Sequence, residues 1–276
     1  MIKTTIITLT WNKLEKATKP FIDSLYKHTR SDDFKLIVVD NGSSDGTLSY
    51  LKDQVKQRGN IVLIANKENL GYSVGNNQGL SEMSPDTDIV GLVNNDILFT
   101  PEWLHSVKSV ILQNEKIGLA SPRINTWRHI NQMNYMAKYK NLLGKYKTSF
   151  SKSLAPNFCC VFMRKAVFDS IGYLDEEFTP AFFEDDDYSL RSLYLGYING
   201  FINSAFLFHN HCTTSGSLAG RKALLERNRQ LFYEKHYLGQ YIYELEAWKK
   251  RPIKTILNSL LNRVMQFSRE SYLSGQ

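Results

Sequence analysis

The sequence predicts an α/β protein with a doubly wound, mostly parallel sheet and helices on both faces. Two observations lead to this fold class. Near-continuous runs of apolar and β-branched residues cover 5–10, 35–40, 61–65 and 89–93, as in strands buried on both faces of a parallel sheet. Helix-length spacers separate these runs. Strand and helix therefore alternate, and the ligands of such a sheet bind beyond the carboxyl ends of its strands.

The helix after the fourth strand carries its own start signals. Thr100 is the predicted N-cap and Pro101 the first helical residue, where a proline loses no hydrogen bond. Leu104, Val107 and Ile111 then fall on one face. We expect this helix to begin at Pro101 and to pack on the sheet through that face.

The second half of the chain is less regular. Residues 123–152 are polar, with many Lys, Asn and Tyr, and predict an excursion over the sheet edge or an insertion beside the site. Residues 159–163 and 201–208 resume strand-like patterns. We find no internal repeat and no low-complexity tract. One sheet domain over residues 1–240, with an appended segment at 241–276, accounts for the length.

Composition narrows the classes of function. The 276 residues are 42% hydrophobic, enough for a sizeable core, and no run of 18 apolar residues predicts a membrane span. The start of the sequence does not resemble a signal peptide, and three cysteines give no disulfide framework, so we expect a cytoplasmic protein. A net charge of +7 suggests an anionic partner such as phospholipid or a diphosphate. We see no nucleic-acid motif and expect no nucleic-acid partner.

The segment after Pro252 differs in kind from the domain. Its apolar residues follow helical spacing and its charged residues are basic, apart from Glu270. This pattern favours equally a helix packed on the domain and a helix lying in a membrane interface. The apolar stripe consists of Ile253, Ile256, Leu257, Leu260, Leu261 and Val264. An anionic membrane surface, on the inner face of the plasma membrane, is therefore a candidate partner.

The most informative motif is a run of four carboxylates at residues 184–187. Carboxylates this close repel one another, so at least one should have a raised pKa, as a general base near neutral pH requires. The alternative is a solvated acidic loop. The flanking Phe182, Phe183 and Tyr188 favour partial burial and hence the catalytic interpretation.

Two glycine-containing motifs follow predicted strands. Asp40 ends the second strand, where its carboxylate could accept from a pyrimidine base or a ribose hydroxyl, although Asp-Gly turns are also ordinary loop chemistry. Gly71, Gly75 and Gly79 are spaced four apart, which places them on one side of a helix. That smooth side admits either a diphosphate or a closely packed neighbouring element.

A candidate metal site follows the fourth strand. Asp96 comes after Asn94 and Asn95, and a hard carboxylate ligand there suits Mg²⁺ or Mn²⁺. His209 and His211 follow the strand-like run 201–208, and Mn²⁺ accepts imidazole. A lone histidine is more often structural than a ligand; the two interpretations are about even for His209, and the structural one is favoured for His211.

These motifs, taken in order, resemble those of a known family. They are VVDNGSSDGT, NLGYSVGNNQG, NND, GYLDEEF with FFEDDDYSLR, and HNHCTTSG with RNRQLFYEKHY. The chain is similar over about residues 1–240 to the family 2 inverting glycosyltransferases of the GT-A fold, and most of all to their bacterial rhamnosyltransferase-like branch.

The resemblance implies a substrate pair and a cofactor. The donor would be a nucleotide sugar, dTDP-rhamnose or a UDP-hexose. The acceptor would be a hydroxyl of a growing cell-surface glycan or lipid-linked glycan, such as O-antigen, lipopolysaccharide or capsule. The cofactor would be a divalent cation, Mn²⁺ or Mg²⁺. The donor-binding residues that the resemblance implies are Thr8, Thr10, Asn12, Asp40, Asn41, Gly71, Asn76, Asn95 and Asp96.

The same resemblance implies roles in catalysis. Asp185 would be the general base, with Glu184 acting beside it. Asp187 would support the pair, and Arg191 would pair with one of these carboxylates. Arg227 would contact a phosphate oxygen of donor or acceptor, or form a surface ion pair.

For the metal, the resemblance places Asp96 at the last position of the DxD element, whose first position is here Asn94. Metal binding would then depend on Asp96 and one histidine. His209 matches better than His211, because the small residues 214–216 then follow it as they do in the family.

Two other classes of protein remain as alternatives. A sugar-1-phosphate nucleotidyltransferase should carry a Gly-rich loop with Arg and Lys after its first strand, whereas residues 9–13 read Leu-Thr-Trp-Asn-Lys. A non-catalytic carbohydrate-binding module would need neither the carboxylates at 184–187 nor Asp96.

Overall fold

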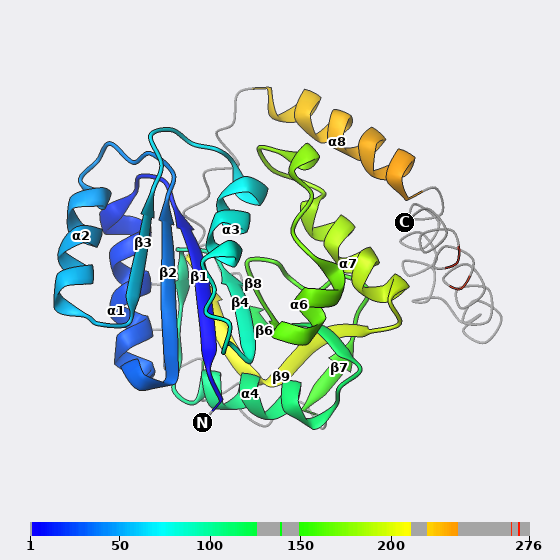
Figure 1. Cartoon of the computed structure of the whole chain (residues 1–276), viewed down its shortest axis with the longest axis horizontal. Coiled ribbons are helices and arrows are strands. Elements are labelled where there is room, and N and C mark those ends of the chain that lie inside the picture. The colour runs from blue at the N-terminus through cyan, green and yellow to red at the C-terminus, as the bar shows by residue number, and fades with distance from the viewer. Residues whose placement is uncertain are drawn as a thin grey trace.

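The computed structural model describes residues 2–125, 139, 149–210, 220–236, 266 and 270. Within them, nine strands form a single sheet in the order β3-β2-β1-β4-β8-β6-β9-β5, with β7 paired to β9 (Figure 1). Helices cover both faces of this sheet. The predicted α/β fold class is confirmed.

The first half of the sheet is parallel. It consists of β1 (Thr4–Thr10), β2 (Phe34–Asp40), β3 (Ile61–Ala65) and β4 (Ile89–Val93). β1 lies between β2 and β4, and β3 extends the sheet beyond β2. These are the four strands that the apolar runs predict, within one residue at each end. Their carboxyl ends meet at one edge of the sheet.

The second half of the sheet is mixed. It contains β5 (Ile97–Leu98), β6 (Ile117–Asn125), β7 (Phe150–Lys152), β8 (Cys160–Arg164) and β9 (Ile198–His209). β8 runs antiparallel to both β4 and β6, whereas β9 runs parallel to β6. β5 and β7 pair antiparallel with β9. β8 and β9 correspond to the strands expected at 159–163 and 201–208.

One face of the sheet is covered by α1 (Lys19–His28), α2 (Thr47–Gln57) and α4 (Trp103–Gln113). Their buried apolar residues form one core with side chains such as Ile6 and Leu36. Short helical turns precede α1 and β2, at Leu14–Thr18 and Ser31–Asp33.

The opposite face is covered by α3 (Tyr72–Ser81), α6 (Lys165–Ile171) and α7 (Glu184–Tyr194). Ile7 and Ile37, which neighbour Ile6 and Leu36 in sequence, face this second core because successive side chains of a strand point to opposite faces. The two cores explain why the strands are apolar without alternation.

The predicted start of α4 is wrong by two residues. The helix begins at Trp103, and Glu102 adopts a left-handed conformation with φ of 58°. The Thr100 hydroxyl does not cap the helix but donates to the carbonyl oxygen of Phe206 at 2.7 Å, which ties this segment to β9. A tertiary hydrogen bond at a buried position therefore overrides the local signal. Leu104, Val107 and Ile111 are buried as expected.

The glycine-lined side of α3 packs on β1. A Cβ at Gly75 would lie 2.7 Å from Leu9 Cδ2, and one at Gly79 would collide with Ile7 Cγ2. Of the two interpretations of this spacing, close helix packing therefore applies to Gly75 and Gly79. Gly71 precedes α3 with φ of 85°.

A small third core joins α7 to α8 (Arg221–Lys235). Phe178, Leu190 and Tyr194 contact Phe232 of α8 there. A single 3₁₀ turn, Glu176–Phe178, lies in the loop that precedes α7.

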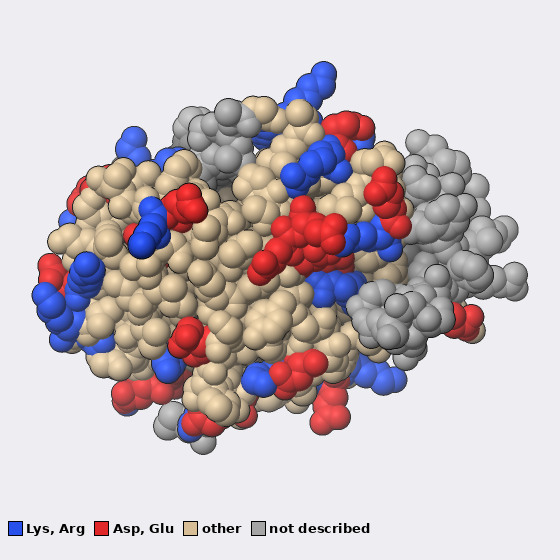
Figure 2. All heavy atoms as spheres, turned by 45° about the horizontal axis from the view of Figure 1, so that its top comes forward, with Lys and Arg blue, Asp and Glu red and all other residues tan. Residues whose placement is uncertain are grey.

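The described residues include no helix long and apolar enough to cross a membrane. The apolar stripe at 253–264 lies outside the described residues, as does most of the 123–152 excursion. Figure 2 shows Lys and Arg scattered among Asp and Glu on the face it presents. The net positive charge does not form one continuous patch on that face.

Candidate active site

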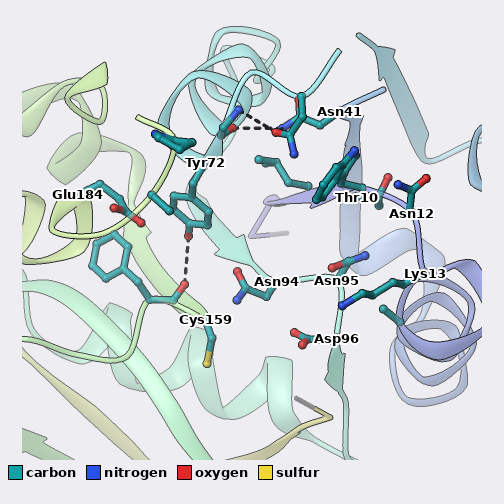
Figure 3. A pocket seen from close by; sticks show the side chains of 18 of the residues that line it. Thr10, Asn12, Lys13, Asn41, Tyr72, Asn94, Asn95, Asp96, Cys159 and Glu184 are labelled. Atoms are coloured by element: carbon teal, nitrogen blue, oxygen red, sulfur yellow. Dashed lines mark hydrogen bonds between the residues drawn. The ribbon is translucent and has the colours of Figure 1, made fainter. Parts of the chain in front are cut away.

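A cavity of about 330 Å³ lies at the carboxyl ends of β1 and β4. Its lining comes from the turn after β1, the segment after β4, the start of α3, and the loop before α7 with the first residues of α7. Figure 3 shows Glu184 across the cavity from Asn12 and Lys13. Segments far apart in the sequence thus meet where a parallel sheet offers a ligand site.

Asp40 stabilises the edge of the cavity. It is fully buried, and its Oδ1 accepts hydrogen bonds from the hydroxyls of Thr10 at 2.9 Å and Ser43 at 2.5 Å. Asn12 continues the link, because its Oδ1 accepts from the backbone N–H of Ser44 at 2.7 Å. Thr10 and Asn12 line the cavity, whereas Asp40 lies behind them, and so does the buried Thr8 within β1.

An amide network holds the next part of the lining. Asn41 Nδ2 donates to the Gly71 carbonyl oxygen at 3.2 Å, and its Oδ1 accepts from Asn66 Nδ2 at 2.8 Å. Asn41 and Gly71 both line the cavity. Asn76 does not line it, because its side chain donates back to the Tyr72 carbonyl oxygen within α3.

The segment after β4 brings Asp96 and His209 together. The carboxylate Oδ1 of Asp96 lies 2.9 Å from His209 Nε2, and both residues line the cavity. The pairing of β5 with the end of β9 creates this contact, since Ile97 is the register partner of His209. Asn95 also lines the cavity, and its Nδ2 donates to Thr18 Oγ1 at 3.0 Å. His211 lies outside the described residues.

These residues fit a divalent cation only in part. Among the described residues, no three His, Cys, Asp or Glu side chains are grouped so that they could hold a metal ion. Asp96 and His209 offer one carboxylate and one imidazole. Mg²⁺ and Mn²⁺ are commonly bound by one or two protein carboxylates together with substrate phosphates. The pair therefore fits a cation whose coordination a diphosphate completes.

The acidic run lies at the start of α7, and Glu184 and Asp185 line the cavity. Burial raises the pKa of Glu184 to about 8, and the neighbouring charge of Asp185 adds to the shift. Burial also raises the pKa of Asp185. Because two adjacent carboxyls, one buried and one half-buried, do not both ionise readily, the pair can hold a proton near neutral pH.

Asp187 belongs to a different, buried cluster. Arg191 contacts its Oδ2 through Nη2 at 2.7 Å and Nε at 2.9 Å, and His236 Nε2 lies 2.8 Å from Oδ1. Burial works against ionisation, but His236 and Arg191 outweigh it and lower the pKa of Asp187. Asp187 and Arg191 do not line the cavity. Asp187 joins α7 to the end of α8 through His236, and Arg191 joins α7 to the end of α6 through the Ile171 carbonyl oxygen.

A family model described as Glycosyl transferase family 2 matches residues 5–171, more than half of the chain. The chain belongs to glycosyl transferase family 2. The match covers β1 to α6 and so includes the carboxyl ends of β1, β2 and β4, whereas the acidic run and α8 lie beyond it.

Two curated relatives of this family 2 chain are described as uncharacterized. An uncharacterized protein of Sinorhizobium fredii, y4gI, is 25% identical over 211 residues, which cover 71% of this chain and 23% of that protein. An uncharacterized glycosyltransferase of Haemophilus influenzae is 30% identical over 86 residues, 31% of this chain and 26% of that protein. The chain spans about a quarter of the length of these relatives.

Solved structures share the fold. GalNAc-T7, solved with UDP, GalNAc and Mn²⁺, gives a TM-score of 0.65 at 14% identity, over 91% of this chain and 54% of that one. The mannosyltransferase PcManGT from Pyrobaculum calidifontis, in complex with GDP-Man and Mn²⁺, gives a TM-score of 0.59 at 16% identity, over 99% of this chain and 74% of that one. S. aureus TarS gives a TM-score of 0.58 at 18% identity, over 75% of this chain and 36% of that one. The family 2 chain therefore has the GT-A fold.

Arg227 differs from its expected placement in the family 2 site. Its Nη2 donates to the carbonyl oxygens of Glu177 at 3.1 Å and Thr179 at 2.6 Å, and it does not line the cavity. Neither a phosphate contact nor a surface ion pair describes these bonds. The side chain instead holds the loop that precedes α7.

Sequence reasoning missed several lining residues of the family 2 site. Lys13, Tyr72, Phe158 and Cys159 all line the cavity. Lys13 could have been found, since it lies three residues after the end of β1. Tyr72 and Phe158 meet only in the fold, where the Tyr72 hydroxyl donates to the Phe158 carbonyl oxygen at 3.2 Å.

Proposed function

We propose that the protein is an inverting glycosyltransferase that transfers a sugar from a nucleoside-diphosphate donor to a hydroxyl of a glycan or lipid-linked glycan. The observation that carries the proposal is the pairing of two chemistries in one cavity. Asp96 and His209 line one part, and Glu184 and Asp185 line another. Displacement at an anomeric carbon needs both a group that receives the leaving diphosphate and a base for the incoming hydroxyl.

The donor side is formed by the strand ends. Thr10, Asn12 and Asn41 present hydroxyl and amide groups to the cavity, which suits a base and ribose. Lys13 is the one Lys or Arg among the described residues that line the cavity, and Figure 3 shows its amine directed toward the region of Asn95 and Asp96. An ammonium group there would offset diphosphate charge. Asp40 would act indirectly, by holding Thr10 in place.

The acceptor side is formed by the start of α7. Asp185 would take the proton of the acceptor hydroxyl as the oxygen attacks the anomeric carbon from the face opposite the diphosphate, which inverts the configuration. Its raised pKa makes it a stronger base than an exposed aspartate. Glu184, whose pKa burial raises to about 8, would carry the proton of the pair and leave Asp185 ionised.

A divalent cation held by Asp96, His209 and the donor diphosphate would stabilise the negative charge that develops on the leaving group. GalNAc-T7 and PcManGT were both solved with Mn²⁺. We propose that the reaction depends on this cation, because Asp96 and His209 fit it. We also propose dTDP-rhamnose or a UDP-hexose as the donor and a cell-surface polysaccharide as the product.

A donor panel tests this function. The protein is incubated with Mn²⁺ and each of several nucleotide sugars, and slow release of nucleoside diphosphate is measured. A glycosyltransferase releases nucleoside diphosphate from at least one donor. A nucleotidyltransferase would instead release pyrophosphate from a nucleoside triphosphate and a sugar 1-phosphate, and a binding module would release neither.

We propose further that the tail attaches the enzyme to anionic membrane beside a lipid-linked acceptor. The support is its sequence alone: an apolar stripe at 253–264 among basic residues. Each basic residue contributes about 1 kcal/mol near an anionic surface, and salt weakens the attraction. The full chain should co-sediment with anionic vesicles at low salt, and truncation before Trp248 should release it with donor hydrolysis intact. Unfolding of the truncated chain would show that the stripe is core.

A further inference from the structure

Helix α8 contacts the loop that precedes the acidic pair. Asn228 is fully buried, and its Nδ2 donates to the carbonyl oxygens of Phe178 at 2.8 Å, Ala181 at 2.8 Å and Phe182 at 2.9 Å. One amide group thus satisfies three backbone acceptors spread over five residues. The neighbouring Arg227 side chain donates to two more carbonyls of the same loop.

This loop has a backbone that it would not adopt without support. Phe182 and Phe183 both have positive φ, 81° and 70°, a region that side chains with a Cβ seldom occupy. Phe183 is the residue directly before Glu184, so its conformation sets where α7 begins. Ala181 and Phe182 also line the cavity. The strained pair therefore determines how Glu184 and Asp185 enter the site.

Other contacts fix α8 in its place beside α7, where Figure 1 shows it above that helix. Phe232, one turn after Asn228, packs against Phe178 and Leu190. His236 follows the last turn and contacts Asp187 of α7. Asn228 is thus presented to the loop by a helix anchored at its carboxyl end.

We propose that Asn228 is a positioning residue for the acceptor-activating carboxylates. It holds the backbone of 178–182 in the conformation that places Glu184 and Asp185 in the cavity. Thr10, Asn41 and Asp96 on the donor side come from the ends of β1, β2 and β4. The loop that Asn228 holds meets the start of α3 instead, where the Tyr72 N–H donates to the Pro180 carbonyl oxygen at 2.9 Å. Loss of Asn228 should therefore slow transfer far more than it weakens donor binding. This inference rests on the proposed glycosyltransferase function.

The test uses the full chain with Asn228→Ala, and Asn228→Ser as a milder variant that keeps a single donor hydrogen. Gln230→Ala is the matched control, because Gln230 is exposed on the same helix and bonds only to Glu234 among the contacts described. Three quantities are measured: kcat and KM for transfer, calorimetric affinity for the nucleoside diphosphate with Mn²⁺, and hydrogen–deuterium exchange of each segment.

Asn228→Ala should lower kcat by about 10- to 100-fold, the loss that a displacement of about 1 Å produces at a catalytic group. Nucleoside diphosphate affinity should stay within about twofold, because Asn228 does not hold the strand ends that carry Thr10, Asn41 and Asp96. Exchange should accelerate in residues 178–187 and not in β1 or β2. Asn228→Ser should lie between Asn228→Ala and the wild type, and Gln230→Ala should match the wild type.

Three results would overturn the proposal: unchanged exchange in 178–187, unchanged kcat despite faster exchange, or equal loss of kcat and diphosphate affinity. The last would indicate a general structural role. If Asn228→Ala does not fold, Asn228→Ser is judged by the same criteria. A wild-type protein that turns over no nucleotide sugar would contradict the proposed function instead, and the exchange measurement would then decide alone whether Asn228 holds the loop.

Discussion

Replacing Asp187 tests the buried charge cluster that joins α7 to α8. Asp187→Asn keeps the shape of the side chain but removes the charge that Arg191 and His236 face. Removing one partner of a buried ion pair costs about 3–5 kcal/mol, because the other charge stays buried without compensation. Arg191 retains a bond to the Ile171 carbonyl oxygen, which favours the lower figure. A loss of about 3 kcal/mol corresponds to a melting temperature about 6–12 °C lower.

The control is a second ion pair with the same spacing. Lys165 and Asp169 also lie four residues apart on a helix, at 2.6 Å, but the Asp169 side chain is 52% exposed. Asp169→Asn should cost less than about 1 kcal/mol, since water screens the pair. Urea denaturation of both variants at pH 7 measures the difference directly. Equal small losses for the two variants would refute the reasoning.

The pH dependence gives a second check of the same prediction. The folded pKa of Asp187 is lowered, so its contribution is fully present above the unfolded value of about 3.9. That contribution is lost as the pH falls through the folded pKa. The stability gap between the wild type and Asp187→Asn should therefore shrink as the pH falls below about 4. A gap that widens below pH 4 would contradict this assignment.

Two further predictions concern the metal and the packing of α3. Asp96→Ala should remove the Mn²⁺-dependent part of nucleoside diphosphate affinity, because Asn94 and Asn95 offer only neutral oxygens to the cation. The affinity is measured by calorimetry with Mn²⁺ and with a chelator. Equal affinities under the two conditions in the wild type would contradict this prediction. Gly79→Ala should destabilise the fold by about 1–3 kcal/mol, because its Cβ would collide with Ile7 in the core, whereas Gly59→Ala has no atom within 4 Å to meet. Equal denaturation midpoints for the two alanine variants would show that the sheet absorbs the extra methyl group.

The sequence was sufficient to predict the elements whose signals are local and repeated. The four apolar runs mark β1 to β4, and because such strands are parallel, their carboxyl ends had to meet at one edge. That rule alone brings Thr10, the Asn41 turn and Asp96 to one cavity. Glu184 and Asp185 could be singled out because adjacent carboxylates between aromatic residues repel one another and lose solvation, which is typical of a functional site.

What the sequence could not supply depends on contacts between distant segments. Thr100 and Pro101 have the local sequence of a helix start, yet the Thr100 hydroxyl donates to the Phe206 carbonyl oxygen 106 residues away. Arg227 resembles a phosphate ligand in the linear motif, but α8 directs it to the loop before α7. Asp40 is buried, and its carboxylate accepts a hydrogen bond from the Thr10 hydroxyl of the neighbouring strand, a contact that the linear motif does not indicate. Each of these outcomes requires the packing to be known.

The role of Asp185 is the central claim, and one variant tests it most directly. Asp185→Asn fills the same volume but cannot take a proton, and loss of a general base typically costs about 10²–10⁴-fold in rate. The measurement is the transfer rate on the donor that the panel identifies, together with calorimetric affinity for its nucleoside diphosphate. Transfer should fall by at least about 100-fold while affinity changes by less than about twofold. Transfer that persists, or affinity that falls in parallel with it, would contradict the assignment of Asp185 as the base.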